Sequence, residues 1–473
     1  MDNKNNDNNY MNDNDMDDMP CCMNRRGFMK IIGAGAAGAA LASIGGCKSE
    51  RDSGRIVPTD KMTYRVDPHT GNRISLLGFG MMRLPRIPRR RGESLPDSND
   101  LDQESVNELV DYAIAHGVNF FDTAPPYCKG FSEKATGEAL SRHPRNKYYV
   151  STKLSNHRLP PAGNREGSIN MYRKSFEDLQ VDYIDYYLLH SVGNLKAFKE
   201  RFIDNGILDF LIKEREAGRI RNLGWSFHGD FDFFEYMMSG KYPWGHVMVL
   251  GNYLDWDNVV GRANIISRRQ HEILEKKNIP AVVMSPLMGG GLSSPHYRAR
   301  EQMVQADSDA SASSWGLRFI GSQPSVLTVL SGMTFMDHLQ DNICTYSPLT
   351  PIAANEQAML DGVTDIMLQY RNILCTRCQY CMPCPYGIDI PEILMHYNRC
   401  MNEGNFPVDN QSENFKKARR AFLVSMDRSV DTLRQANRCI NCGQCVPTCP
   451  QRINIPQEMR RIDKLVEELK IGV

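Results

Sequence analysis

The segment CINCGQCVPTCP, Cys439–Pro450, decides the fold of the carboxyl-terminal part of this chain. Its cysteines follow the spacing C-x2-C-x2-C-x3-C-P, which is typical of proteins that bind a [4Fe–4S] cluster. A second quartet lies upstream, and each quartet runs into a similar segment, CPYGIDIP at Cys384–Pro391 and CPQRINIP at Cys449–Pro456. The repeat predicts two [4Fe–4S] clusters. Their predicted ligands are Cys375, Cys378, Cys381, Cys384, Cys439, Cys442, Cys445 and Cys449.

Two questions about these cysteines stay open in the sequence. Zinc also binds C-x2-C pairs, although a zinc site does not require four cysteines in one run with a proline behind them. In two-cluster ferredoxins the fourth cysteine of each run ligates the other cluster. Such an exchange would move Cys449 to the first set and Cys384 to the second. Only two residues separate Cys381 from Cys384, in place of three, and this shorter spacing leaves the exchange undecided.

Length and composition indicate a soluble protein of two or three domains. The chain has 473 residues, of which 41% are hydrophobic and 24% charged, as in ordinary globular proteins. Lys and Arg together number 56, and so do Asp and Glu. This balance gives no indication of a polyanionic partner such as a nucleic acid. Eight of the 14 cysteines lie in the two quartets, so cluster ligation accounts for most of the cysteine content.

Residues 1–47, at the amino terminus, have the composition of a targeting signal rather than of a folded domain. Residues 1–20 are rich in Asn and Asp and are expected to be disordered. The following NRRGFMK, Asn24–Lys30, and the apolar run Ile31–Ile44 resemble a twin-arginine export signal. Its end resembles a lipoprotein site with Cys47 as the lipidated residue. We therefore expect a periplasmic or cell-envelope location, with a lipid anchor at Cys47. A cytoplasmic reductase with a misinterpreted amino terminus is the alternative.

The middle of the chain predicts a parallel barrel. Residues 48–73 are polar and form an expected linker, whereas residues 74–345 alternate short apolar runs with amphipathic segments. This pattern predicts an α/β fold of βα units around a parallel sheet. Eight such strands have the size of a (β/α)8 TIM barrel, whose active site lies at the carboxyl ends of the strands, and the count of eight is guided by the family resemblance that the motifs below carry. The expected strands are Ser75–Phe79, Val118–Asp122, Tyr148–Thr152, Tyr183–Leu189, Asn222–Ser226, Val247–Leu250, Ala281–Met284 and Val326–Leu330.

The motifs in this region resemble those of the aldo/keto reductase family. They include GVNFFDTAPPY at Gly117–Tyr127, SEKATGEAL at Ser132–Leu140, STK at Ser151–Lys153 and DYIDYYLLH at Asp182–His190. The resemblance covers roughly Ile74–Cys344, and the whole chain resembles the subgroup that is fused to a ferredoxin-type domain. It implies hydride exchange between a nicotinamide cofactor and a small carbonyl or alcohol.

The resemblance places the catalytic residues at Asp122, Tyr127, Lys153 and His190. Reduction of a carbonyl builds an alkoxide that needs a proton, and Tyr127 is the implied general acid. A free phenol titrates near ~10. We therefore expect the Lys153 cation to lower the pKa of Tyr127, with Asp122 holding Lys153 in place. His190 is expected to orient the substrate oxygen.

The cofactor contacts implied by the resemblance are Ser226, Ser285, Asp341 and Asn342. Several neighbouring positions depart from the family pattern, and the departures put the choice between NAD and NADP in doubt, because the Lys and Arg that grip a 2′-phosphate are replaced. The departing residues are Phe227, Leu250, Met284, Gly332, Met333 and His338.

The carboxyl-terminal region is expected to be a helical ferredoxin-like domain. Residues 346–372 predict a linker helix, and residues 373–473 predict the cluster domain. Between the quartets, Glu392–Cys400 and Glu413–Ala436 have helical patterns. Taken together, the sequence predicts an oxidoreductase in which two clusters pass electrons to or from a reductase barrel. A membrane-bound or soluble redox partner would then exchange electrons with the clusters. The alternative is an electron-transfer subunit whose barrel is mainly a scaffold.

Overall fold

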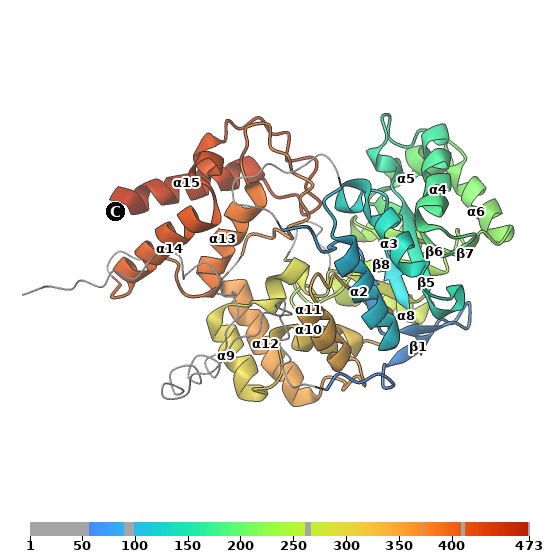
Figure 1. Ribbon diagram of the computed structural model, residues 1–473, viewed down its shortest axis with the longest axis horizontal. Coiled ribbons are helices and arrows are strands. Elements are labelled where there is room, and N and C mark those ends of the chain that lie inside the picture. Colours follow the sequence, from blue (N-terminus) through green and yellow to red (C-terminus); the bar gives the residue numbers. More distant parts are fainter. Residues whose placement is uncertain (1–55, 89–98, 261–265, 371, 408–411, 472–473) are drawn as a thin grey trace, which may run out of the picture. The chain divides into compact units, whose positions relative to one another are not determined.

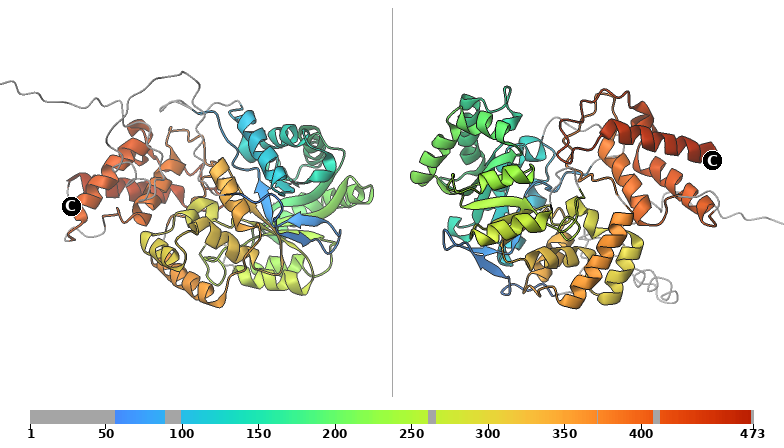
Figure 2. Two further views of the ribbon diagram at one scale, coloured as in Figure 1. Left: turned by 60° about the horizontal axis from the view of Figure 1, so that its bottom comes forward. Right: turned by 180° about the vertical axis from the view of Figure 1, so that it is seen from behind.

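A computed structural model describes residues 56–88, 99–260, 266–370, 372–407 and 412–471. Eight parallel strands close into a barrel in the order β10-β3-β4-β5-β6-β7-β8-β9, and helices surround it (Figures 1 and 2). The predicted (β/α)8 barrel is therefore confirmed. Its strands are β3 Leu77–Gly80, β4 Phe120–Asp122, β5 Tyr149–Leu154, β6 Ile184–Val192, β7 Ile220–Phe227, β8 His246–Leu250, β9 Ala281–Met284 and β10 Val326–Ser331.

The helices pack on the outside of the barrel because their apolar residues recur on one face. In α2 that face consists of Val106, Leu109, Val110 and Ala113, which are all buried. The side chain of Asp102 caps the helix by accepting a hydrogen bond from the Ser105 amide. The helices of the barrel are α2 Gln103–Ala115, α3 Ser132–Leu140, α4 Arg165–Leu179, α5 Leu195–Phe198, α6 Ile207–Glu216, α7 Phe231–Met237, α8 Ser267–Lys276, α9 Tyr297–Ala306, α10 Ala312–Gly321, α11 Met336–Thr345 and α12 Ala354–Gln369.

A short hairpin precedes the barrel, within a segment that the sequence predicted as linker. It pairs β1 Tyr64–Val66 with β2 Arg73–Ser75 in antiparallel fashion. Asp67, in the turn, is fully buried and accepts a hydrogen bond from the Tyr186 hydroxyl of β6 at 2.7 Å. The turn therefore inserts a polar group among the inward-facing side chains at the amino ends of the strands. The opposite end, where the strands finish, is left for chemistry.

The cluster domain has its own core, as predicted. Helices α13 Ile390–Asn402, α14 Phe415–Ser429 and α15 Ile455–Ile471 lie beside one another (Figure 1). They bury Ile393, Phe422 and Met459 almost completely. The cysteine quartets lie in loops at the edge of this core, so helices rather than a β-sheet hold the cluster loops.

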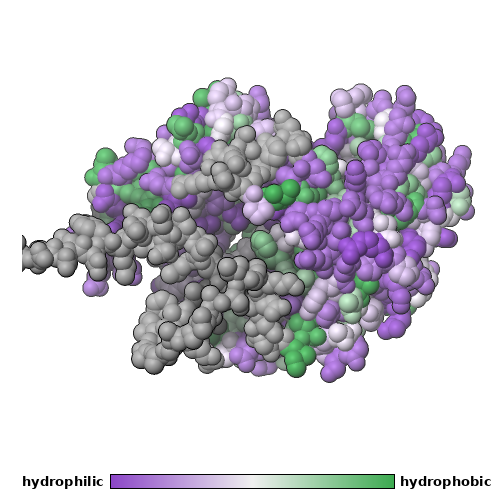
Figure 3. Space-filling view, in the orientation of Figure 1, coloured by the Kyte–Doolittle hydropathy of each residue, from purple (hydrophilic) through white to green (hydrophobic). Residues whose placement is uncertain are grey.

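The face in Figure 3 is mainly hydrophilic over the barrel, with apolar residues scattered among polar ones. In the described parts of the chain, no helix has both the length and the apolar character to cross a bilayer. The predicted export signal and Cys47 lie outside the described residues.

Candidate active site and cluster sites

A buried ion pair lies where strands β4 and β5 end. The Nζ atom of Lys153 donates to Oδ2 of Asp122 at 2.6 Å and to the carbonyl of Thr123 at 2.6 Å. Lys153 is fully buried, and Asp122 is 3% exposed. Burial raises the pKa of Asp122 and lowers that of Lys153, and the contact between them opposes both shifts. The pair is therefore held in one geometry by hydrogen bonds on both sides.

Tyr127 lies directly beside this pair, just after β4. Its ring centroid is 4.9 Å from Nζ of Lys153 and 6.0 Å from the ring of His190. Burial and the charge of Asp122 raise the pKa of Tyr127 well above its ordinary value. The expected lowering by Lys153 is thus wrong in direction, because Asp122 balances the charge of Lys153 and burial disfavours the phenolate. Tyr127 keeps its proton and is a proton donor at neutral pH.

His190, near the end of β6, completes the group. Its Nδ1 lies 2.5 Å from Oγ of Ser155, and its ring packs edge-on against His157 at 5.2 Å. Burial and the Lys153 charge lower the pKa of His190 well below its ordinary value. Burial likewise lowers the pKa of His157 to about 3 and that of His228 to about 4. All three imidazoles are therefore neutral, and each carries one N–H donor.

The structure brings all four predicted catalytic residues together. A phenol that holds its proton and a neutral imidazole beside it can both donate to one oxygen atom. Such donors stabilise the negative charge that develops on a carbonyl oxygen during reduction. Sequence reasoning missed Ser155, although it follows Lys153 by only two residues and fixes the orientation of the His190 ring.

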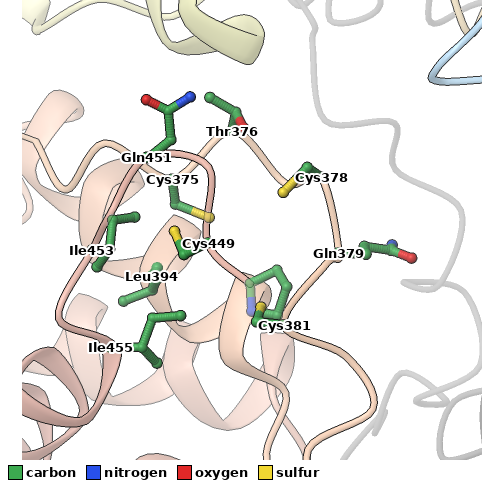
Figure 4. Close-up of a pocket in the computed structure, with 11 residues that line it drawn as sticks. Cys375, Thr376, Cys378, Gln379, Cys381, Leu394, Cys449, Gln451, Ile453 and Ile455 are labelled. Atoms are coloured by element: carbon green, nitrogen blue, oxygen red, sulfur yellow. The ribbon is translucent and has the colours of Figure 1, made fainter. Parts of the chain in front are cut away.

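Four cysteines of the cluster domain line one small cavity. They are Cys375, Cys378 and Cys381 of the first quartet and Cys449 of the second (Figure 4). Apolar side chains close the cavity, among them Leu394, Ile453 and Ile455. We call this set of four thiols the first cysteine site.

The other four cysteines line a separate small cavity. Cys384 joins Cys439, Cys442 and Cys445 there, and we call this set the second cysteine site. The structure therefore brings together the two exchanged sets, despite the shorter spacing before Cys384. Each site combines a close-set trio with one cysteine that arrives from the other loop.

The backbone also repeats between the two sites. Arg377 and Gln379, on either side of Cys378, adopt φ of 54° and 62°. Asn441 and Gly443, on either side of Cys442, adopt φ of 64° and 74°. A left-handed conformation costs a residue with a side chain roughly 1–2 kcal/mol. The same conformation at matching positions shows that the two trios are carried by loops of similar backbone conformation.

Comparison with known proteins agrees with both parts of the chain. Residues 76–364 match the aldo/keto reductase family. This chain is a member of the aldo/keto reductase family. Residues 374–454 match a 4Fe–4S dicluster domain, so the reductase barrel is joined to an iron–sulfur domain.

Relatives of this aldo/keto reductase match it mainly over the barrel. L-Galactose dehydrogenase of Arabidopsis thaliana is 24% identical over 330 residues, covering 66% of this chain and 97% of the relative. Protein tas of Escherichia coli is 25% identical, covering 60% of this chain and 92% of the relative. The holo form of an aldo-keto reductase from Bacillus halodurans superimposes with a TM-score of 0.51 at 20% identity, over 64% of this chain and 96% of that protein. This structural likeness supports the fold.

Three of the four predicted cofactor residues of this aldo/keto reductase already make hydrogen bonds within the protein. Oγ of the fully buried Ser226 accepts a hydrogen bond from the Ser191 amide at 2.8 Å. Asp341 accepts from the Ser311 hydroxyl at 2.6 Å, and Asn342 donates to Oγ of Ser331 at 2.9 Å. Ser285 follows β9 with φ of 57°. The barrel is of a fold that supports a nicotinamide cofactor, and the nicotinamide of this chain stays a prediction.

Sequence reasoning also missed the contacts between the first cysteine site and the reductase barrel. The guanidinium of Arg158 lies 4.6 Å from the ring centroid of Tyr380, which stands between Cys378 and Cys381. Burial raises the pKa of Tyr380, and charge on Tyr127 or Cys378 would raise it further. Tyr380 thus lies within electrostatic reach of both sites. The aromatic residue between two ligand cysteines was the only available signal.

Proposed function

We propose that this chain interconverts a carbonyl and an alcohol of a small molecule by net transfer of a hydride at the Tyr127 site. The observation that carries the proposal is the group of a protonated phenol, a neutral imidazole and a buried ion pair at the ends of β4, β5 and β6. Tyr127 gives its proton to the substrate oxygen. His190 donates to the same oxygen and orients it, while Lys153 and Asp122 hold the Tyr127 ring in position.

We further propose that the chain holds two [4Fe–4S] clusters, one at each cysteine site. Four thiolates are the usual ligand set of such a cluster, and each cluster would carry one electron at a time when bound. Cys375, Cys378, Cys381 and Cys449 would hold the first cluster. Cys384, Cys439, Cys442 and Cys445 would hold the second. The separate cavities and the repeated backbone support two centres rather than one.

Replacement of Tyr127 by Phe tests the catalytic proposal. Loss of a general acid costs about 10²–10⁴-fold in rate, and we expect a decrease in that range. Activity would be measured anaerobically with reduced viologen as donor. Sugars are the first substrates to test, because one relative is named L-galactose dehydrogenase.

A matched control is Tyr187→Phe in the same barrel. Tyr187 is fully buried on β6, and its hydroxyl has no hydrogen-bond partner within the described structure. This variant should turn over like the native protein. Unchanged turnover in Tyr127→Phe would contradict the enzyme proposal and favour the alternative in which the barrel is mainly a scaffold.

We also propose export by the twin-arginine route, supported by the NRRGFMK segment at Asn24–Lys30. Export of the folded protein suits a chain whose clusters are built inside the cell. Replacing Arg25 and Arg26 together by Lys should keep the protein in the cytoplasmic fraction. An unchanged distribution in cell fractionation would reject the proposal.

A further inference from the structure

The loops that follow the last two strands of a (β/α)8 barrel frequently form its phosphate-binding site. In this chain they follow β9 and β10 and contain Gly289 and Gly332. Glycines at such places let a phosphate approach the backbone closely. The family resemblance aligns Gly332 with a residue that grips the 2′-phosphate of NADP. This edge of the barrel is therefore where the phosphate groups of a dinucleotide are expected.

The chain itself fills this edge. A methyl group on Gly289 would lie 2.7 Å from Cβ and 2.8 Å from Cα of Thr376, which follows the cluster ligand Cys375. A methyl group on Gly332 would lie 3.1 Å from Cδ of Arg83. Arg83, after β3, donates from Nη2 to the carbonyl of Thr376. The space above both glycines is thus occupied by Arg83 and by the loop of the first cysteine site.

A further contact holds the cluster domain against the loop after β9. Nδ2 of Asn402, at the end of α13, donates to the carbonyl of Ser294 at 2.7 Å. Ahead of the first quartet, the ring of Tyr370, at the end of α12, stacks on that of His296 at 4.0 Å with an interplanar angle of 6°. Neither contact involves a cysteine. The chain is therefore held to this loop on both sides of the first quartet by residues with no other evident role.

The loop of the first cysteine site, Cys375–Cys381, also reaches the catalytic side of the barrel. Tyr380 packs under the guanidinium of Arg158, which follows the end of β5. Arg452, three residues after Cys449, lies close enough to His228 for its charge to lower the pKa of that imidazole. The first cysteine site is therefore held over the barrel from several sides.

We propose that the loop Cys375–Cys381 takes the place of an exchangeable dinucleotide and forms a wall of the substrate site, so that the first cysteine site faces Tyr127 directly. Three observations carry this inference: the filled edge at Gly289 and Gly332, the engaged polar groups of Ser226 and Asn342, and the contact of Tyr380 with Arg158. The residues of this chain do not fit a freely exchanging dinucleotide while the loop is in place.

The two electrons of the reaction would then come from the clusters at the two cysteine sites. Conversion of a carbonyl to an alcohol takes up two electrons and two protons, and each cluster supplies one electron when bound. Tyr127 delivers one proton to the oxygen, and water delivers the other to carbon. A one-electron carrier outside the chain, such as a reduced viologen in the assay, restores the two electrons. This scheme rests on the proposed function, and the experiments below are independent of turnover.

The first experiment measures nucleotide binding to the anaerobically purified holoprotein. NADPH, NADP+, NADH and NAD+ are titrated by calorimetry, and nucleotide released by acid denaturation is quantified. We expect no co-purified nucleotide and no binding tighter than about 1 mM. A single site per chain with micromolar affinity, or stoichiometric nucleotide in the purified protein, would overturn the inference. Loss of turnover in Tyr127→Phe would still uphold the proposed function.

The second experiment displaces the loop with a matched pair of substitutions. Gly289→Ala and Gly290→Ala both place alanine at a positive φ, 69° and 99°. Only the methyl at position 289 meets Thr376, since nothing lies within 4 Å of the one at position 290. We expect Gly289→Ala to speed the oxidation of the reduced clusters by ferricyanide several-fold, and Gly290→Ala to leave the rate at the native value.

Iron content and circular dichroism establish that both variants are folded. If Gly289→Ala does not fold, Arg83→Met removes the hydrogen bond to Thr376 without adding atoms at the barrel edge. Arg83→Met should increase the rate of cluster oxidation, as expected for Gly289→Ala. Native oxidation rates in the folded variants would show that the loop does not cover this edge, and the inference would be wrong.

Discussion

Cys442 of the second cysteine site is exposed, and its neighbours Ile440 and Tyr386 are 59% and 44% exposed. At the first site, Thr376 lies against the barrel, and the partly buried guanidinium of Arg83 is near Cys375 and Cys378. The motif is the same at both sites, but the surroundings differ. A one-electron carrier can approach the second site from solvent, whereas the first site is proposed to face Tyr127. Under that proposal, electrons would pass from solvent through the second site to the first and then to the catalytic residues.

The largest effect expected from this comparison is loss of one whole cluster. Cys449→Ser should remove the centre held by the first quartet's trio, although Cys449 belongs to the other sequence motif. Cys384→Ser should remove the other centre. Iron should fall from about eight to about four atoms per chain in each case.

Paramagnetic resonance of the reduced protein distinguishes the two losses. Cys449→Ser should give the same remaining signal as Cys375→Ser, and Cys384→Ser the same as Cys439→Ser. The opposite grouping, by sequence motif, would show that the ligands are not exchanged and would break the comparison between the two sites.

The next effect separates the stability of the barrel from that of the cluster domain. Glu133 of α3 is 3% exposed, and burial raises its pKa to about 7. The folded pKa of Glu133 is higher than its ordinary value of about 4.3. The contribution of Glu133 to the free energy of unfolding is therefore fully present below about pH 4.3 and is lost as the pH rises to about 7. The loss amounts to about 3 kcal/mol.

Glu133→Gln should remove this slope between pH 5 and 8. All four tryptophans, Trp225, Trp244, Trp256 and Trp315, lie in the barrel, so their fluorescence during urea unfolding reports that domain. Absorbance of the clusters should be indifferent to the substitution. A pH slope that persists in Glu133→Gln would assign it to another group.

A smaller effect concerns the charge near the first cysteine site. Burial lowers the pKa of Arg83, and the neighbouring thiolates of Cys378 and Cys375 oppose that shift. Reduction of a cluster adds negative charge, which a nearby cation stabilises. Arg83→Met should therefore lower the midpoint potential of the first cluster by roughly 30–60 mV, where 59 mV is tenfold for one electron. The second cluster is the internal control, and equal shifts in both would contradict the distinct surroundings.

The sequence was a good guide wherever a pattern is local. The barrel strands were predicted to within a few residues, because alternation of apolar strands and amphipathic helices is visible over short windows and the family resemblance guided the count of eight. The four catalytic residues were predicted because the motifs that contain them resemble those of the aldo/keto reductases. The hairpin strand β1 was missed, since Tyr64–Val66 is only three residues long and is half-exposed to exposed.

What could not be predicted depends on residues far apart in the chain. Arg83 and Thr376 are 293 positions apart, and no local pattern connects them. The pKa of Tyr127 was predicted in the wrong direction for a related reason. Opposite charge was evident from Lys153, but the depth of burial and the balancing contact of Asp122 exist only in the folded barrel.

The smallest effect compares one backbone position at the two sites. Gln379 and Gly443 occupy matching places with φ of 62° and 74°, a conformation that favours glycine. Gln379→Gly should stabilise the cluster domain by at most about 1 kcal/mol, and Gly443→Gln should destabilise it by a similar amount. Nothing lies within 4 Å of a methyl on Gly443, so backbone conformation alone sets the cost there. Calorimetry of the holoprotein should show shifts of opposite sign, about a few degrees at most. Shifts of the same sign would mean that side-chain contacts, rather than the shared backbone of the two cysteine loops, govern this position.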